Sequence, residues 1–327
     1  MMHRLGLFVF GACALLVHIA SPAIAQDSYP SRPIRLVILV TPGGGSDVTA
    51  RTIGQKLTES WGQQVIVDNR PGAGGIVGME ITAKANPDGY TLVLGTIGPV
   101  AVNPSLYEKL PYDSSKSFDA VARTVSALNV LVVRPTLPVS SVKELIAYAK
   151  ANPGKLNFGS SGAGAADHLA GELFNTLAGV RMQHVPYKGG APAMIDLLGG
   201  NVELIFATVS TAVAHLKSGR IRPLAITAGK RTDLFPDIPT VAEAGVPGFA
   251  VENWYGVIAP AGVPKPIIGK LHREINRILT LPDVKERLYS MGIVPFPAAS
   301  PDEFGSYIKA EINKYGAVVK AAGIKPN

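Results

Sequence analysis

The stretch 156–174, LNFGSSGAGAADHLAGELF, predicts a strand, a glycine-rich loop and an amphipathic helix in that order. The loop covers residues 159–164, and apolar residues such as Ala166, Leu169 and Leu173 then recur at helical spacing. A glycine-rich loop that ends at a helix N-terminus collects unpaired backbone N–H groups at the positive end of the helix dipole. The stretch therefore predicts an anion-binding site, to which Ser160 and Ser161 add hydroxyl donors.

The same arrangement is predicted near the start of the chain. Residues 34–40 are expected to form a strand that is apolar except for Arg35, and residues 41–47, TPGGGSD, a loop before a second amphipathic helix. Ser46 or Asp47 can serve as the N-cap of that helix, which would satisfy its backbone N–H groups. Two units of this kind, with polar loops and no catalytic set between them, predict a small anion held between two domains.

Strands and helices alternate along the rest of the chain, which predicts an α/β fold with mainly parallel sheets. A Ser141–Glu144 capping box opens one of the helices. The length of 327 residues is enough for two domains. Further strands are expected at 64–67, 90–94, 130–133, 202–206 and 223–227, and further helices at 76–84, 142–152, 191–198, 266–280 and 301–322.

Residues 1–25 have the pattern of a cleaved secretory signal peptide. Arg4 precedes an apolar run, and residues 23–25, AIA, supply small side chains before Gln26. A membrane anchor is the alternative, but the run is short for a span and contains His18. The one cysteine, Cys13, leaves with the signal, which excludes a disulfide framework, a thiolate zinc site and a cysteine nucleophile. We expect a soluble, periplasmic protein.

The charge balance excludes few ligand classes by itself. The chain carries 31 basic and 24 acidic residues, a formal net charge of +7, which suits an anionic ligand or a basic secreted protein. No basic stripe has interleaved aromatic residues, so we expect no nucleic-acid partner. No His-x-x-x-His spacing is present, so neither a metal nor another cofactor is expected.

The glycine loops do not match the enzyme motifs that they resemble. The loop at 43–47 lacks the lysine of a phosphate-binding loop, and Gly72-Ala73-Gly74 lacks the third glycine of a dinucleotide site. The loop at 159–163 is not a nucleophile elbow. An exported enzyme remains the alternative, with His168 as base and Ser160 or Ser161 as nucleophile, although a structural role suits a lone histidine better.

Other polar or aromatic residues are candidates for the same site. Tyr187 and Lys188 follow a strand and offer a phenol donor and a positive charge, although surface placement explains Lys188 equally well. Trp254 lies where the chain is expected to return between domains, and packing in the core is the equal alternative. Thr96 and Thr208 follow two of the predicted strands and complete the set.

A series of short motifs, in order and spacing, resembles the Bug family of periplasmic binding proteins, the receptors of tripartite tricarboxylate transporters. The resemblance covers residues 29–324. The motifs are YPSRP at 29–33, PGGGSD at 42–47, NRPGAGG at 69–75, PDGYTL at 87–92, NFGSSG at 157–162, HLAGEL at 168–173, VPYKG at 185–189, PT at 239–240, EAG at 243–245, Trp254 and APAG at 259–262.

The resemblance implies a two-domain, type II-like periplasmic binding protein with its ligand cleft between the domains. One domain comprises 26–125 and 250–327 and the other 126–249, with hinges near Ser126 and Phe249. It implies a monomer that delivers a small organic carboxylate to membrane transporter subunits, and a ligand sensor for a signalling partner is a further alternative. The expected ligand-binding residues are Gly44, Gly45, Ser46, Asp47, Thr96, Ser160, Ser161, Gly162, Gly164, His168, Tyr187, Lys188, Thr208 and Trp254.

Two departures from the family pattern bear on the ligand. Ala165 stands where the family has serine or threonine, so a hydroxyl donor is lost. The run 207–212, ATVSTA, lacks the aspartate that is common there, and a missing acid no longer favours an amine on the ligand. We therefore expect a carboxylate without an amino group, aromatic or dicarboxylic in character.

Overall fold

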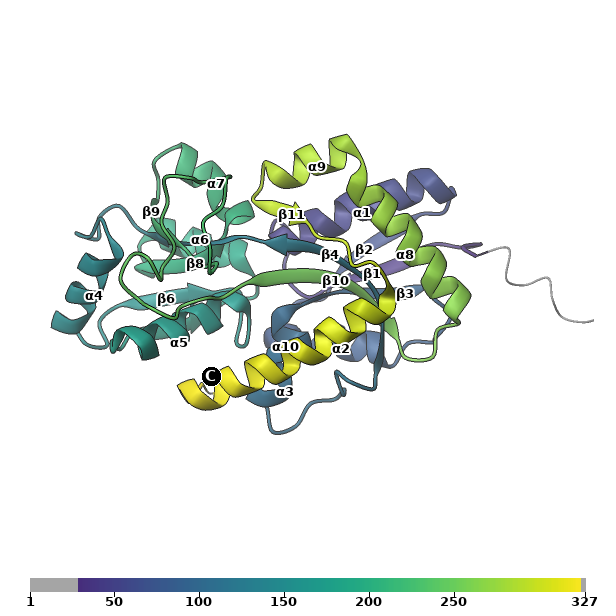
Figure 1. Cartoon of the computed structure of the whole chain (residues 1–327), viewed down its shortest axis with the longest axis horizontal. Helices are drawn as coiled ribbons and strands as arrows, with labels where there is room; N and C mark the ends of the chain where they lie inside the picture. The colour runs from purple at the N-terminus through teal and green to yellow at the C-terminus, as the bar shows by residue number, and fades with distance from the viewer. Residues whose placement is uncertain (1–28, 325–327) are drawn as a thin grey trace, which may run out of the picture.

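The computed structural model describes residues 29–324, and the predicted signal peptide lies outside this range. Two mixed sheets lie side by side, each covered by helices (Figure 1). Within the described part of the chain, no helix combines the length and apolar character that a membrane crossing requires. We call each sheet with its helices a lobe.

The first lobe contains a six-stranded sheet whose order is β11-β4-β10-β3-β1-β2. Strands β1, β2 and β3 are parallel, whereas β10 lies antiparallel between β3 and β4. The strands are β1 (Ile34–Ile38), β2 (Val65–Asn69), β3 (Thr91–Thr96), β4 (Phe118–Ala127), β10 (Asn253–Pro260) and β11 (Ile293–Pro295). The helices are α1 (Gly45–Trp61), η1 (Ala73–Gly75), α2 (Ile76–Ala83), η2 (Gly98–Val102), α3 (Asn103–Leu106), α8 (Lys265–Thr280), α9 (Pro282–Tyr289) and α10 (Pro301–Ala322).

The second lobe contains a five-stranded sheet whose order is β7-β6-β8-β5-β9. Strand β6 is parallel to both of its neighbours, and β5 is antiparallel to both of its own. The strands are β5 (Asn129–Val133), β6 (Asn157–Ser160), β7 (Gln183–Pro186), β8 (Leu204–Thr208) and β9 (Arg222–Ile226). The helices are α4 (Val142–Ala151), α5 (Ala166–Ala178), α6 (Gly190–Gly199) and α7 (Val209–Lys217).

The prediction of mainly parallel sheets is wrong, because several strands enter the sheets without a helical crossover. Strand β4 continues through the single residue Leu128 into β5 of the other lobe, and β10 brings the chain back. A strand that arrives from the neighbouring lobe need not run in the direction of the βαβ units, and both β5 and β10 are antiparallel to their neighbours. Alternation of strands and helices along the sequence does not reveal such crossings.

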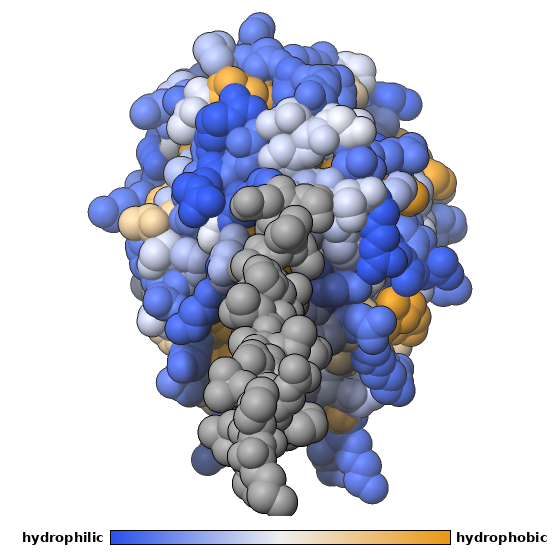
Figure 2. All heavy atoms as spheres, turned by 90° about the vertical axis from the view of Figure 1, so that its right-hand side faces the viewer, coloured by the Kyte–Doolittle hydropathy of each residue, from blue (hydrophilic) through white to orange (hydrophobic). Residues whose placement is uncertain are grey.

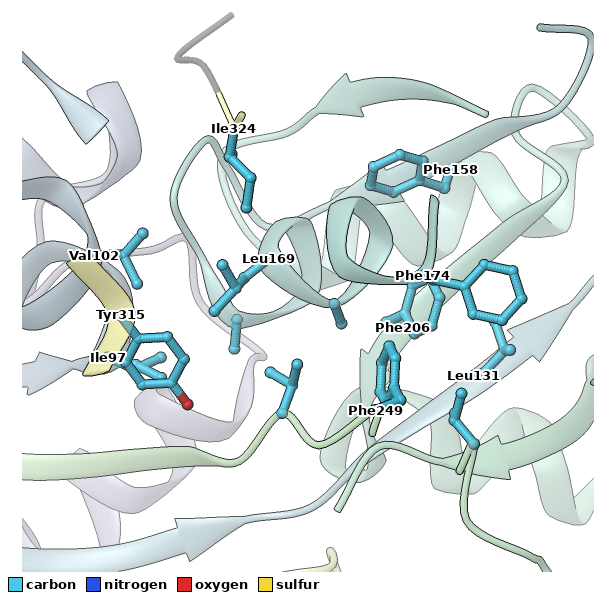
Figure 3. Packing of buried hydrophobic residues seen from close by; sticks show 14 of the residues in the cluster. Ile97, Val102, Leu131, Phe158, Leu169, Phe174, Phe206, Phe249, Tyr315 and Ile324 are labelled. Carbon is cyan, nitrogen blue, oxygen red and sulfur yellow. The ribbon is translucent and has the colours of Figure 1, made fainter. Parts of the chain in front are cut away.

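A continuous apolar core joins the two lobes. In the second lobe, Phe206 packs against Phe174 and Phe249 at ring-centroid distances of 5.8 and 6.2 Å. Figure 3 shows these rings on one side and, towards the first lobe, Leu169 beside Ile324, which follows α10. Helix α10 contacts β4 and η2 in the first lobe and α5 in the second, so it lies across both (Figure 1).

The surface at the end of the first lobe is mostly hydrophilic, with apolar residues in small separate groups (Figure 2). Scattered apolar residues of this kind are normal on a protein surface and need no binding partner. The visible part of this surface therefore gives no indication of a binding site.

Candidate functional site

A cavity between the two lobes is lined by residues from both of them. The volume of the cavity is about 90 Å³, counted as the space that the centre of a water-sized molecule can occupy. This is several times the volume that one ordered water needs. The lining residues are Leu39, Val40, Gly44, Gly45, Ser46, Gly72, Ala73, Gly74, Gly75, Thr96, Ile97, Pro99, Asn129, Ser161, Ala165, Ala166, Asp167, Tyr187, Lys188, Gly190, Thr208, Thr211, Asn253 and Tyr255.

Five helices begin at this cavity, and none of them has a side-chain cap. Helices α1, α2, α5, α6 and α7 have the N-cap residues Gly44, Gly75, Ala165, Gly189 and Thr208, none of which makes a side-chain capping bond. Among the helices that begin away from the cavity, serine hydroxyls cap α4 and α10, whereas α8 and α9 have a proline in the first turn and no side-chain cap. The first N–H groups of an uncapped helix need another acceptor, and an anion is a suitable one.

Asp47 fixes the loop at residues 41–47, which we call the first ligand loop. The helix begins at Gly45 with Gly44 as its N-cap, so the prediction that Ser46 or Asp47 is the N-cap is wrong. Asp47 instead reaches back to accept a hydrogen bond from the Gly43 N–H at 3.1 Å. Burial opposes ionisation of this carboxyl, but bonds from Arg51, Asn69 and Gly43 outweigh it and lower the pKa of Asp47.

The loop at residues 159–164, which we call the second ligand loop, is also fixed by a carboxylate in the first turn of the following helix. Asp167 accepts hydrogen bonds from the N–H of Ser161 at 2.7 Å, from the Ser161 hydroxyl at 2.9 Å and from the N–H of His168 at 3.0 Å. Its side chain is buried, and this burial raises the pKa of Asp167 to about 6 even though the hydrogen bonds act to lower it. In both loops, a carboxylate in the first helical turn fixes the backbone that faces the cavity.

A stacked pair of histidines lies behind the second ligand loop. The rings of His168 and His184 have centroids 3.9 Å apart and planes 21° apart. His168 Nδ1 accepts a hydrogen bond from the Gly164 N–H at 3.0 Å, and His184 Nε2 lies 2.6 Å from the Ser160 hydroxyl. Burial lowers the pKa of His168 to about 4 and that of His184 to about 3.

This arrangement differs from the pairing required by the enzyme alternative. The Ser160 hydroxyl contacts His184 rather than His168, and the Ser160 side chain is fully buried behind the loop. Among residues 29–324, no group of three histidine, cysteine, aspartate or glutamate side chains is placed to hold a metal ion.

The structure brings eight of the fourteen predicted ligand residues to the cavity: Gly44, Gly45, Ser46, Thr96, Ser161, Tyr187, Lys188 and Thr208. The phenol of Tyr187 is already engaged, because it donates to Asp196 at 2.6 Å. The other six do not line the cavity. Asp47 and His168 bond the two loops from the helices that follow them, Ser160, Gly162 and Gly164 belong to the second loop itself, and Trp254 lies in the core.

Trp254 is fully buried on the side of β10 that faces α10. Its indole N–H donates to Glu311 of α10 at 2.9 Å, and its ring meets Phe304 and Tyr307 edge to face at 5.8 and 5.6 Å. These contacts show that the Trp254 side chain packs α10 against the sheet.

Replacing Trp254 with phenylalanine is expected to destabilise the fold by about 1–3 kcal/mol, because the buried Glu311 carboxylate loses a donor. Ligand affinity should stay within about twofold, since the ring does not line the cavity. Urea unfolding and calorimetric titration measure the two effects separately. A large loss of affinity with unchanged stability would place Trp254 in the ligand site after all.

Residues 72–75 line the cavity but are not among the predicted ligand residues. All four have positive φ, namely 136° at Gly72, 47° at Ala73, 60° at Gly74 and 89° at Gly75. Ala73 is the one non-glycine residue with positive φ in the described chain. The glycines of NRPGAGG were the available signal, because such a backbone strongly favours glycine. Asn129, Thr211, Asn253 and Tyr255 were also missed and carried no local signal.

Two α/β lobes with a cavity between them, surrounded by helix N-termini, define the class of periplasmic solute-binding proteins. Residues 49–324 match the model of the tripartite tricarboxylate transporter family receptor, and the chain belongs to that family. The resemblance inferred from the sequence motifs is thereby confirmed.

Individual relatives agree with this assignment. The chain is 39% identical to protein BugT of Bordetella pertussis over 98% of each chain. Among solved structures, an R. palustris protein with adipate has 38% identity and a TM-score of 0.88, covering 91% of this chain and 100% of the other. MatC from Rhodopseudomonas palustris with bound malate has 32% identity and a TM-score of 0.85, covering 89% and 100%.

Proposed function

We propose that the protein is a periplasmic receptor that binds a small organic carboxylate between its lobes and delivers it to membrane transporter subunits. The observation that carries the proposal is the convergence of five uncapped helix N-termini on one cavity. Backbone N–H groups at helix N-termini bind a carboxylate without a fixed cation. Adipate and malate in the related structures are dicarboxylates, which supports the same ligand class here.

The charges at the cavity favour a ligand without an amino group. Lys188 is the only basic residue in the lining, and Asp167 is the only acidic one. Asp167 already accepts three hydrogen bonds from Ser161 and His168, so little of its acceptor capacity is left for an ammonium group. A dicarboxylate or hydroxycarboxylate avoids this unpaired charge.

We further propose that the lobes close over the ligand as a monomer, with the boundaries and hinges expected from the sequence. Contacts between the lobes support a closed form here, since the Thr41 N–H of the first lobe donates to the Lys188 carbonyl of the second at 3.0 Å. Backbone of the two lobes also meets at Gly98 and Gly164. Hinge closure of this type sequesters a ligand from water.

Malate and aspartate form a matched pair that tests the proposal, because they differ only in a hydroxyl or an ammonium group. We expect malate or adipate to raise the melting temperature of the protein by mass action and aspartate to leave it unchanged. The ligand should be recovered chemically unaltered after prolonged incubation. If aspartate alone raised the melting temperature, the proposal of a ligand without an amino group would be excluded. If the ligand were chemically converted during the incubation, the enzyme alternative would be favoured.

Delivery to a transporter requires a separate measurement. Transport by membrane vesicles that contain the cognate membrane subunits should depend on added receptor. Ligand binding without receptor-dependent transport would favour the sensor alternative.

A further inference from the structure

Both stacked histidines contact the second ligand loop through ring nitrogens. His168 comes from α5 and His184 from β7, and Phe158 of β6 stacks on His184 at 5.1 Å. Each ring is bonded to a different end of the loop, at Ser160 and at Gly164. The conformation of the loop therefore depends on the state of both rings.

The bond from Gly164 requires a neutral His168. Its Nδ1 atom accepts the Gly164 N–H at 3.0 Å, so Nδ1 carries no proton in this arrangement. A protonated imidazole carries hydrogens on both nitrogens. Protonation would point two N–H groups at each other and remove the acceptor of a buried amide. A charged His168 would also face the second ring of the pair at 3.9 Å, so protonation of both rings is disfavoured.

Glu172 on α5 would favour a charged His168, because its Oε1 atom lies 3.9 Å from His168 Nε2, within ion-pair distance although beyond hydrogen-bond distance. Burial raises the pKa of Glu172, which weakens this opposing effect as the pH falls. Asp167 on α5 is occupied by the Ser161 bonds, and β6, η2 and α3 carry no titratable residue. The last turn of α10, which packs against α5, adds only Lys320, and this side chain is exposed.

We propose that His168 is a positioning residue that, together with His184, makes carboxylate affinity depend on pH. The neutral pair holds residues 160–164 in the ligand-binding form, and protonation of His168 releases the Gly164 amide and with it the loop. This inference rests on the proposed carboxylate binding at the same loop.

The sign of the effect follows from the direction of the shifts. The binding form holds the pKa of His168 near 4 and that of His184 near 3, below the value of about 6.5 for a free imidazole. A released loop therefore takes up protons that the binding form rejects, and affinity falls as the pH drops below about 6.5. Asp167 acts in the opposite sense because its pKa is raised to about 6. This upward shift of one pKa is smaller than the downward shifts of the two histidine pKa values combined.

The test compares adipate affinity at pH 7.5 and pH 4.5 by calorimetry in four proteins: the wild type, His168→Asn, His168→Leu and the double variant His168→Asn/His184→Gln. Asparagine places an oxygen near the position of Nδ1 and can accept from Gly164 without titrating. Leucine cannot accept. Adipate itself titrates in this pH range. The quantity compared is therefore the change in adipate affinity between pH 7.5 and pH 4.5 in each variant, divided by the same change in the wild type.

We expect His168→Leu to bind weakly at both pH values and His168→Asn to recover binding at pH 7.5. Acidification should weaken wild-type binding on the order of tenfold more than binding by the double variant, a typical size for coupling between sites. Equal pH effects in the wild type and the double variant would overturn the inference and leave the proposed function intact.

Amide hydrogen exchange at Gly164 tests the loop without any ligand. The wild type should lose protection at Gly164 on going from pH 7.5 to 4.5, relative to other loop amides, and His168→Asn should not. If this difference is present while adipate and malate fail to bind the wild type at pH 7.5, the proposed function fails and the coupling of the loop to His168 stands. If Gly164 exchange changes equally in both proteins, the inference is wrong.

Discussion

Replacing Gly98 with alanine is expected to weaken carboxylate binding by about 10–100-fold while leaving the fold intact. Gly98 begins η2 of the first lobe, and a Cβ atom there would lie 2.8 Å from the carbonyl oxygen of Gly164 and 3.1 Å from the Cα of Ala165. These atoms belong to the backbone of the second ligand loop and cannot turn aside. An overpacked contact costs about 1–3 kcal/mol, and each 1.4 kcal/mol is a factor of ten in affinity.

The cost falls on the closed form alone, because Gly98 does not have positive φ and the backbone accepts alanine without strain. Gly305→Ala on α10 is the matched control, since its Cβ would make an ordinary 3.8 Å contact with Ala120. Calorimetry measures the affinities, and small-angle scattering measures the opening of the lobes. Wild-type affinity in Gly98→Ala would mean that the lobes do not need this approach in order to bind the ligand.

Replacing Asp167 with asparagine is expected to reduce affinity by about 10–100-fold and to lower the melting temperature. The carboxylate accepts three hydrogen bonds, two of them from Ser161. An amide offers one acceptor oxygen, so its NH₂ group must face one of these donors. A buried donor left without a partner costs about 1–3 kcal/mol, and here that donor belongs to the loop that faces the ligand.

Asp302→Asn is the control, because Asp302 is exposed in the first turn of α10 and far from the cavity. It should keep wild-type affinity and lose little stability. The decisive measurement is calorimetric titration of both variants with the same dicarboxylate. If Asp167→Asn bound as tightly as Asp302→Asn, the support of the loop by Asp167 would be irrelevant to the site.

Local features of the site could be predicted from the sequence. The glycine-rich loops and the helices that follow them depend on residues close together in the chain, and α1 and α5 begin where the glycine pattern ends. The exact cap was missed, because Ser46 and Asp47 are good N-caps by propensity. The backbone instead begins the helix at Gly45, which leaves Asp47 free to bind the loop behind it.

Features that depend on distant residues could not be predicted. His184 is bonded to Ser160 across 24 positions, and no local pattern links the two. For Trp254 the sequence left lining of the cleft and packing in the core as equal alternatives, because the partner that decides between them, Glu311, lies 57 residues away on α10. The antiparallel pairing of β10 with β3 and β4 likewise joins segments that are far apart in the sequence. The hydrophobic periodicity of a strand does not indicate whether it runs parallel or antiparallel to its neighbours.

The position of β10 has a consequence for how the chain folds. Residues 253–260 supply the strand that separates β3 from β4, so the first sheet cannot be completed until most of the chain has been synthesised. Pairing over such sequence separations makes folding slow, because loop-closure entropy is lost before the contacts form. The first lobe therefore needs both ends of the described chain, and β3 and β4 have no strand between them until residues 253–260 join the sheet.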